Sequence, residues 1–409
     1  MQKTKQKQNI PKGWQRVKLA ELGVMRGGLS GKNKTHFGHG KPFVTYMNVF
    51  SNPHLNRDNV NFVEIREGEK QNKLQYGDYL FTTSSETPKE VGMSSVVDFE
   101  PSELYLNSFC FIFRPEKDLI EPAFGGYMFR GSVFRKTIAT HAKGSTRFNL
   151  SKKDFLDVDV VFPNSKSEQK KIAEILGAVD EEIQKTDEII SATEKLKKGL
   201  IQDLFTKNND IKKLKIKDFS EVTSSKRVMV SDYVDEGIPF YRSTEIIKKS
   251  KNIPLANLLY ISTEKYNFFK ERFGAPEKGD ILITAVGTIG DVYMVQNEVF
   301  YFKDGNTIWV RKIKDSILPE YLRMMLGSNF YREKLNNIAG GSSQKALTIQ
   351  KLENVEVPVP SISEQKKLIE VISSVENKTK IYIQTKNNLD QLKKGLMQDL
   401  LSGNKRVKV

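Results

Sequence analysis

The length and charge of the chain narrow its class before any motif is considered. At about 150 residues per domain, its 409 residues predict two or three domains. The 65 Lys and Arg against 50 Asp and Glu give a formal charge of +15, which indicates a polyanionic partner. Hydrophobic residues at 38% exclude a disordered basic tail. We therefore expect a folded protein that binds a polyanion, with nucleic acid as the first candidate.

Cysteine and hydrophobic content bear on the compartment. The single cysteine, Cys110, excludes an intrachain disulfide scaffold, and its place in the apolar run 109–113 predicts a buried strand residue. Residues 1–13 contain no apolar segment of the kind that signal peptides use. No stretch approaches the roughly 18 apolar residues of a membrane span. We expect no membrane association and a cytoplasmic location.

The chain repeats itself at an offset of about 196 residues. Four motifs recur in the same order: Gly-Asp-x-Leu-x-Thr at 77–82 and 279–284, Gly-Ser-Thr/Ser at 144–146 and 341–343, Ser-Glu-Gln-Lys-Lys at 167–171 and 363–367, and Leu-Lys-Lys-Gly-Leu at 196–200 and 392–396. A series in one order predicts two copies of one unit, at roughly 14–206 and 211–402.

Each copy is expected to begin with a mixed domain and to end in a long helix. In its first 150 or so residues, short β-type runs alternate with helical stretches such as 122–136 and 319–335. The last 40 or so residues lack proline, and Ser167 and Ser363 are the predicted N-caps. The apolar residues there have helical spacing, and the two stripes are Ile172, Leu176, Val179, Ile183, Ile190, Leu196, Leu200 and Leu204, and Leu368, Ile372, Val375, Tyr382, Leu389, Leu392, Leu396 and Leu400.

A helix of about 37 residues would span about 55 Å, which is typical of a strut. Thr186 and Thr193 interrupt the coiled-coil spacing of the first stripe. We favour antiparallel packing of the two helices, because two copies of one unit tend to be related by a pseudo-two-fold axis. The alternative is that each helix lies on its own domain. Gly199 and Gly395, each costing about 1 kcal/mol inside a helix, indicate a close backbone approach or a partner surface, and the alternative is that both glycines are merely tolerated.

Catalytic motifs are mostly missing from the sequence. The nearest phosphate-loop candidate, Gly31-Lys32-Asn33, lacks both the upstream glycine and the hydroxyl residue. The chain has no Pro-Pro dipeptide, which amino-methyltransferases need in their base-gripping loop. His36 and His39 are the one close histidine pair, and without a cysteine cluster we expect no zinc site. This pattern favours a binding protein, although weak nuclease motifs leave a nuclease centre open.

Loops that combine glycine, hydroxyl and basic residues are the candidate DNA contacts. Backbone amides, hydroxyls and basic side chains suit phosphate, and Gln, Asn and Arg suit base edges. The candidates are Arg26, Ser30, Lys32 and Lys34; Lys143, Ser145, Thr146 and Arg147; Ser225, Lys226 and Arg227; and Ser342, Ser343, Gln344 and Lys345.

With these doubled motifs and the Trp-Gln-Arg-Val-Lys-Leu start at 14–19, the sequence resembles the specificity (S) subunit of type I restriction-modification systems. The resemblance covers essentially the whole chain in the correct order. The second copy departs from the pattern, because residues 211–214 (Ile-Lys-Lys-Leu) stand where the tryptophan segment is usual.

The resemblance implies an α+β fold with two similar mixed α/β target recognition domains, joined by two long antiparallel coiled-coil-like helices. The implied boundaries are 1–13 (basic tail), 14–163 (recognition domain 1), 164–206 (helix 1), 207–360 (recognition domain 2), 361–403 (helix 2) and 404–409 (basic tail). Each domain would read one half of a bipartite, asymmetric double-stranded DNA site, and the helices would fix the spacer.

The resemblance also implies a chain without catalytic residues or cofactors of its own. S-adenosylmethionine, ATP and Mg²⁺ would belong to two modification subunits and two restriction subunits. Gly199, Leu200, Gly395 and Leu396 are the candidate contacts for the modification subunits. Two alternatives stay open at this point: a repeat-built scaffold without DNA contact, and a single-chain nuclease or methyltransferase with unrecognised motifs.

Overall fold

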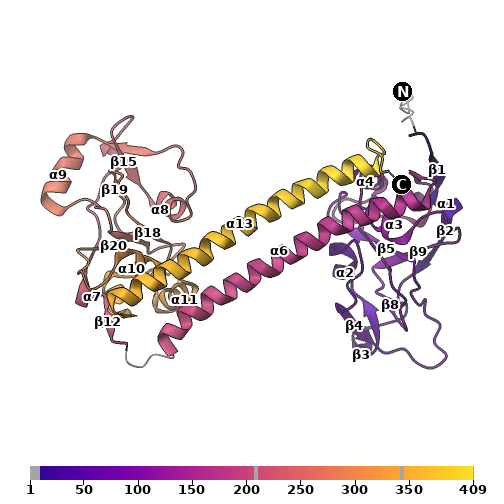
Figure 1. Cartoon of the computed structure of the whole chain (residues 1–409), viewed down its shortest axis with the longest axis horizontal. Helices are drawn as coiled ribbons and strands as arrows, with labels where there is room; N and C mark the ends of the chain where they lie inside the picture. The colour runs from indigo at the N-terminus through magenta and orange to yellow at the C-terminus, as the bar shows by residue number, and fades with distance from the viewer. Residues whose placement is uncertain (1–9, 207–210, 341–344, 409) are drawn as a thin grey trace. The chain divides into compact units, whose positions relative to one another are not determined.

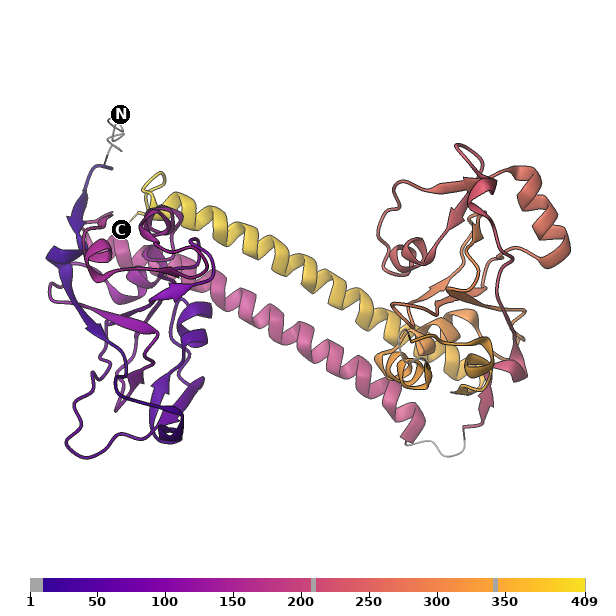
Figure 2. The same cartoon turned by 180° about the vertical axis from the view of Figure 1, so that it is seen from behind.

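The computed structural model describes residues 10–206, 211–340 and 345–408. The chain forms two compact units (Figures 1 and 2). Unit 1 combines the chain up to Thr186 with the part from Gln384 onward, and unit 2 is Asp187–Ile383. Each unit therefore contains one mixed domain and one part of each long helix, so the unit boundaries fall inside the helices rather than at their ends.

Unit 1 contains the first mixed domain. Its strands are β1 (Trp14–Lys18), β2 (Gly23–Gly27), β3 (Phe37–Val44), β4 (Val60–Val63), β5 (Tyr79–Thr82), β6 (Ser84–Ser85), β7 (Ser94–Val96), β8 (Tyr105–Leu106), β9 (Cys110–Pro115), β10 (Phe148–Asn149) and β11 (Asp159–Pro163). Its short helices are α1 (Leu19–Leu22), η1 (Lys34–His36), α2 (Tyr46–Ser51), α3 (Pro122–Met128), α4 (Ser132–His141) and α5 (Lys152–Leu156).

Two sheets and two strand pairs organise this domain. The sheets have the orders β2-β9-β5-β7 and β4-β3-β8, and β1 pairs with β11 and β6 with β10. An aromatic core, in which Phe81 contacts the rings of Phe111, Phe129 and Phe155, lies between the first sheet and helices α3 to α5. Cys110 is buried in β9, as expected, and burial raises the pKa of its thiol to about 12.

Unit 2 contains the second mixed domain. Its strands are β12 (Lys213–Lys215), β13 (Glu221–Thr223), β14 (Tyr233–Val234), β15 (Ile238–Tyr241), β16 (Leu259–Ile261), β17 (Ile281–Thr284), β18 (Val292–Met294), β19 (Tyr301–Phe302), β20 (Thr307–Arg311) and β21 (Glu356–Pro358). Its short helices are α7 (Ile216–Phe219), η2 (Val230–Asp232), α8 (Ser243–Ser250), α9 (Thr263–Phe273), α10 (Pro319–Leu326), α11 (Asn329–Ile338) and α12 (Ile349–Glu353).

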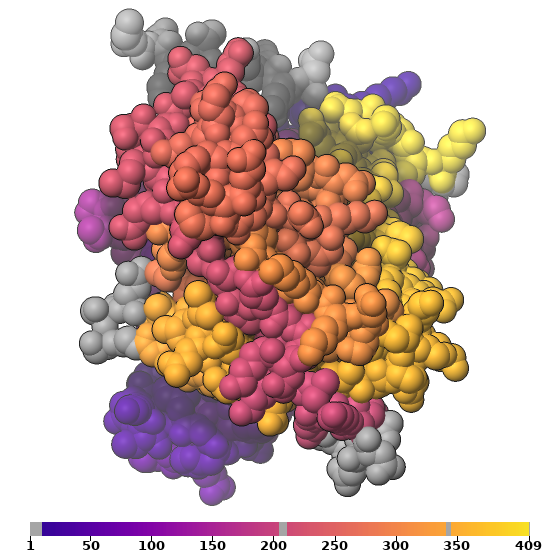
Figure 3. All heavy atoms as spheres, turned by 90° about the vertical axis from the view of Figure 1, so that its left-hand side faces the viewer, coloured from indigo at the N-terminus to yellow at the C-terminus, as the bar shows by residue number. Residues whose placement is uncertain are grey.

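The second domain repeats the first. Its sheets β13-β20-β17-β18 and β14-β16-β15-β19 and its pair β12-β21 correspond to the sheets and the β1-β11 pair of unit 1. In both domains one parallel pair, β3-β8 or β15-β19, lies at the edge of the second sheet. Helix α9 is an addition, because residues 64–78 of unit 1 are all described and contain no helix. It lies at the side of unit 2 away from the long helices, within the coral surface of Figure 3.

The two long helices are α6 (Lys166–Thr206, 41 residues) and α13 (Ile362–Leu401, 40 residues). Their predicted N-caps are wrong by two residues. The hydroxyls of Ser165 and Ser361 accept the amides of Glu168 and Glu364 at 3.3 Å in both cases, so the helices begin earlier than Ser167 and Ser363. The Ser-x-x-Glu pattern of a capping box explains the shift, because the carboxylate of Glu364 also accepts the Ser361 amide.

The helices run antiparallel. In unit 1 Lys393 forms an ion pair with Asp180, and in unit 2 Lys197 forms one with Glu376 at 2.6 Å. As the residue number rises on α6 it falls on α13. The break in the predicted stripe at Thr193 lies in this contact, since Thr379 donates a hydrogen bond to its hydroxyl at 3.1 Å.

Each long helix begins in its own domain and ends in the core of the other. Ile172 and Leu176 of α6 are buried in the core of unit 1, where Leu400 of α13 is also buried. Ile201 of α6 is buried in the core of unit 2 with Ile372 of α13. The helices therefore do not each lie on their own domain alone, and the predicted fold class is confirmed.

The glutamine of the repeated Ser-Glu-Gln-Lys-Lys motif ties each helix to its domain. Gln169 is fully buried, accepts the amide of Glu121 at 2.7 Å and donates to the carbonyls of Leu119 and Pro163 at 2.9 and 2.8 Å. Gln365 makes the same three bonds in unit 2, to Leu318, Ser316 and Pro360. The repeat of this motif thus has a structural cause.

The end of the chain packs on unit 1. Arg406 forms a bidentate pair with the buried carboxylate of Glu168, at 2.6 and 2.7 Å. Gly403 adopts φ +74° and lies against Pro11 and Trp14. Within the described residues, no helix is long and apolar enough to cross a membrane.

Candidate nucleic-acid interface

The two candidate loops of the first copy meet at one turn, Asn107–Phe109. We call this meeting point of two loops and a turn the junction of the domain. The Leu29 amide donates to the carbonyl of Leu106 at 2.7 Å, which brings in the loop from Arg26 to Lys34. Gly28 is required there, because a Cβ would lie 2.0 Å from the carbonyl oxygen of Asn107.

The second loop of unit 1 reaches the same turn from the other side. Leu150 donates its amide to Thr83 at 3.0 Å, and Thr83 donates its own to Phe109 at 2.9 Å. The guanidinium of Arg147 lies 6.0 Å from the centre of the Phe109 ring. Gly144 (φ +148°) allows the tight hairpin, since a Cβ would lie 2.0 Å from the carbonyl of Arg147.

Unit 2 builds the same junction around the turn 303–306. Ala285 donates to the carbonyl of Asn306 at 2.9 Å, and Leu347 donates to Ala285 at 2.8 Å. The first loop arrives through Ser225, whose hydroxyl donates to the carbonyl of Phe302 at 2.7 Å. Equivalent backbone bonds therefore hold the second loop in both domains, whereas the first loop is held by a backbone amide in unit 1 and by the Ser225 hydroxyl in unit 2.

Several predicted DNA contacts are exposed at these junctions. Arg26, Ser30 and Lys34 are exposed, and so are the loop residues Ser145 and Thr146. Neither Arg26 nor Lys34 forms an ion pair with another described residue. In unit 2, Lys226 and Lys345 are exposed, and the ammonium of Lys226 lies 4.8 Å from the centre of the Phe273 ring.

Four other candidates have intramolecular partners. Lys143 pairs with Asp154 at 2.7 Å and Arg227 with Asp304 at 3.0 Å. The Ser225 hydroxyl is buried in its bond to the backbone, as described above. The fourth candidate is Lys32, whose side chain is only 5% exposed. These residues shape the loops rather than presenting free donors.

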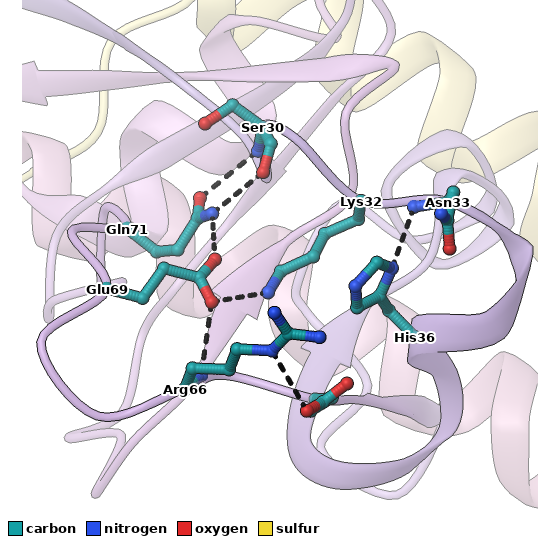
Figure 4. A network of polar contacts seen from close by, with 8 residues as sticks. Ser30, Lys32, Asn33, His36, Arg66, Glu69 and Gln71 are labelled. Carbon is teal, nitrogen blue, oxygen red and sulfur yellow. Dashed lines mark hydrogen bonds and ion pairs between the residues drawn. The ribbon is translucent and has the colours of Figure 1, made fainter.

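Figure 4 shows how Lys32 is used in unit 1. Its ammonium lies 2.6 Å from the carboxylate of Glu69, which also accepts the side-chain amide of Gln71 and the backbone amide of Arg66. These partners, Lys32 first, lower the pKa of Glu69 to about 2. Gln71 in turn bonds both backbone groups of Ser30 at 3.1 and 2.8 Å. The network fixes the loop that carries Lys34.

Three candidates, Ser342, Ser343 and Gln344, lie outside the described residues. Phe109 was missed, because the sequence places it in the apolar run that forms β9, yet it belongs to the turn and is 58% exposed. The preceding Asn107 and Ser108 are residue types that favour turns, so the sequence does contain a signal that Phe109 belongs to a turn. Met229 and Val230, 59% and 81% exposed, were missed as well.

The candidate subunit contacts lie on the long helices. A Cβ at Gly199 or Gly395 would meet no described atom within 4 Å, so neither glycine serves a close backbone approach within the described chain. Leu200 and Leu396 are partly buried against the cores of their units. Two leucines of the predicted apolar stripes, Leu196 and Leu392, are instead 52% and 50% exposed.

Comparison with known proteins decides the family. A family model described as the type I restriction modification DNA specificity domain matches residues 11–194 and 208–391, which is most of the chain. The chain belongs to this family of specificity subunits.

Individual relatives agree with this assignment. A putative type I restriction enzyme specificity subunit of Methanocaldococcus jannaschii, MjaX, is 25% identical over 98% of this chain and 95% of the relative. A putative specificity subunit of Haemophilus influenzae is 30% identical over 41% of each chain. The crystal structure of an S subunit from M. genitalium shares the fold, with a TM-score of 0.56 at 15% identity over 97% of both chains.

The resemblance inferred from the sequence is thus confirmed, and the chain is a DNA sequence-specificity subunit of a type I restriction-modification system. The family is non-catalytic. The two alternatives, a scaffold without DNA contact and a single-chain nuclease or methyltransferase, are not favoured. DNA and the other subunits of such a system are its implied partners.

Proposed function

We propose that each recognition domain reads one half of a bipartite, asymmetric double-stranded DNA site through the loops at its junction. The observation that carries this proposal is the pair of junctions, which share the backbone bonds from Thr83 and Leu150 and from Ala285 and Leu347 but are lined by different side chains. Around Asn107–Phe109 the exposed groups are an aromatic ring and Arg147, whereas the turn 303–306 carries Asp304 paired with Arg227. Different chemistry on one scaffold suits two different half-sites.

The positive charge supports the DNA proposal independently. Arg26 and Lys34 in unit 1, and Lys226 and Lys345 in unit 2, are exposed cations on the junction loops. Phosphate contacts of this kind supply sequence-independent affinity that weakens with salt. Base contacts from neighbouring side chains then supply selectivity, about 1–3 kcal/mol for each wrong base pair.

The long helices are proposed to fix the spacer between the half-sites. Because each helix is anchored in both cores, its length limits how the two junctions can be separated. We infer further that residues 14–163 and 207–360 act as the two recognition domains, with 164–206 and 361–403 as the spacer helices and basic tails at 1–13 and 404–409.

Two modification subunits are proposed to dock on the helices. Leu196 with Gly199, and Leu392 with Gly395, form equivalent exposed patches in the two copies of one motif. Two identical patches suit two copies of one partner. Those subunits would bring S-adenosylmethionine, two restriction subunits would bring ATP and Mg²⁺ chemistry, and the complex would act on DNA in the cytoplasm.

A chimera tests the one-domain, one-half-site proposal. Residues 14–150 are replaced by those of a homologue with a known site, and methylome sequencing compares the chimera with the parent complex. We expect one half-site to change while the other half-site and the spacer stay the same. A change in both half-sites would contradict the proposal.

A matched insertion tests the spacer proposal. Seven residues, two helical turns, are added after Thr186 on α6 and after Ile383 on α13, so that both helices lengthen together. At 1.5 Å per residue and 3.4 Å per base pair, the spacer should grow by about three base pairs with both half-sites unchanged. An unaltered spacer in an active complex would overturn the proposed role of the helices.

A further inference from the structure

Each recognition domain carries a 3₁₀ turn directly after its first junction loop. In unit 1 the turn is η1, and the Asn33 amide donates to the imidazole of His36 at 3.1 Å. In unit 2 the turn is η2, and the Met229 amide donates to the carboxylate of Asp232 at 2.8 Å. The two turns occupy the same place in the repeated fold and are closed by the same kind of bond.

The turn of unit 2 is held from outside as well. Asp232 forms an ion pair with Lys265 of α9 at 3.1 Å. The Met229 amide and, after it, Lys265 lower the pKa of Asp232. The preceding loop is fixed by the bond from the Lys226 amide to the hydroxyl of Tyr301 at 3.0 Å. A side chain at the tip of η2 therefore projects from a rigid base.

The two tips differ in chemistry. Unit 1 presents Asn33 and Lys34, the counterparts of Met229 and Val230, which are both exposed and polar. Unit 2 presents Met229 and Val230, 59% and 81% exposed, and Val230 is the most exposed of the large hydrophobic side chains described. Single exposed apolar residues are ordinary, but here two adjacent ones stand at a closed turn, separated from Lys226 and Arg227 only by the buried Val228.

We propose that Met229 and Val230 determine specificity by contacting the methyl group of a thymine in the half-site of the second domain. This inference rests on the proposed function. In the major groove the C5-methyl of thymine is the apolar group that an aliphatic side chain can recognise. The exposed Lys226, three and four residues away, can lie on a neighbouring phosphate, and phosphate contacts fix the position of a reading element.

The first domain reads differently at the equivalent place. The ammonium of Lys34 is a donor that suits guanine O6 and N7, and the hydroxyl of Thr35 is engaged with the side chain of Asn33 at 2.6 Å. The two turns thus give one asymmetry between the half-sites: an apolar contact in the second domain and a donor contact in the first.

The experiment uses the chain in complex with its modification subunits and a duplex containing its site. Each thymine of the second half-site, on both strands, is replaced in turn by deoxyuridine, which lacks only the methyl group. Affinity is measured for the wild-type complex, for Val230→Ser, and for Ile253→Ser, which changes a 47% exposed apolar residue elsewhere in unit 2.

For the wild type, deoxyuridine at one position should lower affinity about fourfold, the value of one buried methyl-sized group. In Val230→Ser the same replacement should have no further effect, whereas Ile253→Ser should respond as the wild type does. Methylation at the first half-site reports in every sample that the complex is folded. The proposal is wrong if the second half-site is still recognised but no thymine has a methyl effect that disappears in Val230→Ser. In that case the apolar tip serves another partner. If the second half-site is not discriminated at all, the proposed function itself fails.

Discussion

The two recognition domains share their internal bonds but not the side chains that face outward. The backbone bonds from Thr83 to Phe109 and from Ala285 to Asn306 are equivalent. The side chains of the two acceptor residues differ, because Phe109 carries an exposed aromatic ring and Asn306 a polar amide. The repeated motifs follow the shared bonds, as Gln169 and Gln365 show. In this protein, therefore, residues that recur between the copies hold the scaffold, and residues that differ at equivalent places are the candidates for DNA reading.

One repeated residue departs from this rule. Asp78, in the first Gly-Asp motif, makes a bidentate pair with Arg114 at 2.7 Å for both bonds. Its counterpart Asp280 instead accepts the indole N–H of Trp309 at 2.8 Å. The two aspartates close the same turn, since they accept the amides of Gln75 and Glu277, but among the described residues only Asp78 forms an ion pair.

The largest effect is expected at the shared scaffold. Gln169→Ala and Gln365→Ala each remove three hydrogen bonds in a buried site, which should lower the free energy of unfolding of the unit concerned by about 2–4 kcal/mol. Urea unfolding, with hydrogen exchange of peptides from each unit, measures this. Gln398→Ala on the exposed side of α13 is the control and should change stability little. If only one of the two glutamine substitutions lowered the stability of its unit, the two scaffolds would not be equivalent.

A smaller and unequal effect is expected at the two aspartates. Asp78→Asn removes the charge from a buried pair and should cost about 2 kcal/mol. Asp280→Asn keeps an oxygen for Trp309 and should cost less than 1 kcal/mol near neutral pH. The same unfolding measurements on the two variants test this order, and equal costs would contradict the assigned partners.

The second aspartate also predicts a pH dependence. Burial raises the pKa of Asp280, so the folded unit favours its protonated form. The stability that this group contributes is therefore present at acidic pH and is lost as the pH rises through the folded pKa. Compared with the wild type, Asp280→Asn should gain relative stability as the pH rises above about 4, the ordinary pKa of an aspartate. A constant difference over this range would exclude the raised pKa.

The smallest effects are expected at single DNA contacts. Arg147→Ala removes a guanidinium that forms no ion pair with a described residue, so it should weaken binding of the first half-site and lower the salt dependence by about one counterion. Arg227→Ala should weaken the second half-site less, because Arg227 is already paired with Asp304. Salt titrations on duplexes with one half-site scrambled measure each arm. A larger loss for Arg227→Ala would reverse the comparison.

Local patterns in the sequence predicted what depends on local physics. The helical period, the absence of proline and the recurrence of motifs are enough for two domains and two long helices, and the N-cap error of two residues arose from choosing Ser167 rather than the serine three residues before Glu168. The use of Lys32 could not be predicted, because its partner Glu69 lies 37 residues away. Phe109 looked like a strand residue because its neighbours are apolar. Convergence of the loops depends on sheet pairing, which no single segment encodes.

The position of Arg406 has a practical consequence. Its bonds to Glu168 and to the backbone of Lys12 make the segment after α13 a physical part of the first recognition domain. Removing the segment that carries Arg406 would therefore disturb the first recognition domain, although Glu168 lies 238 residues earlier in the sequence.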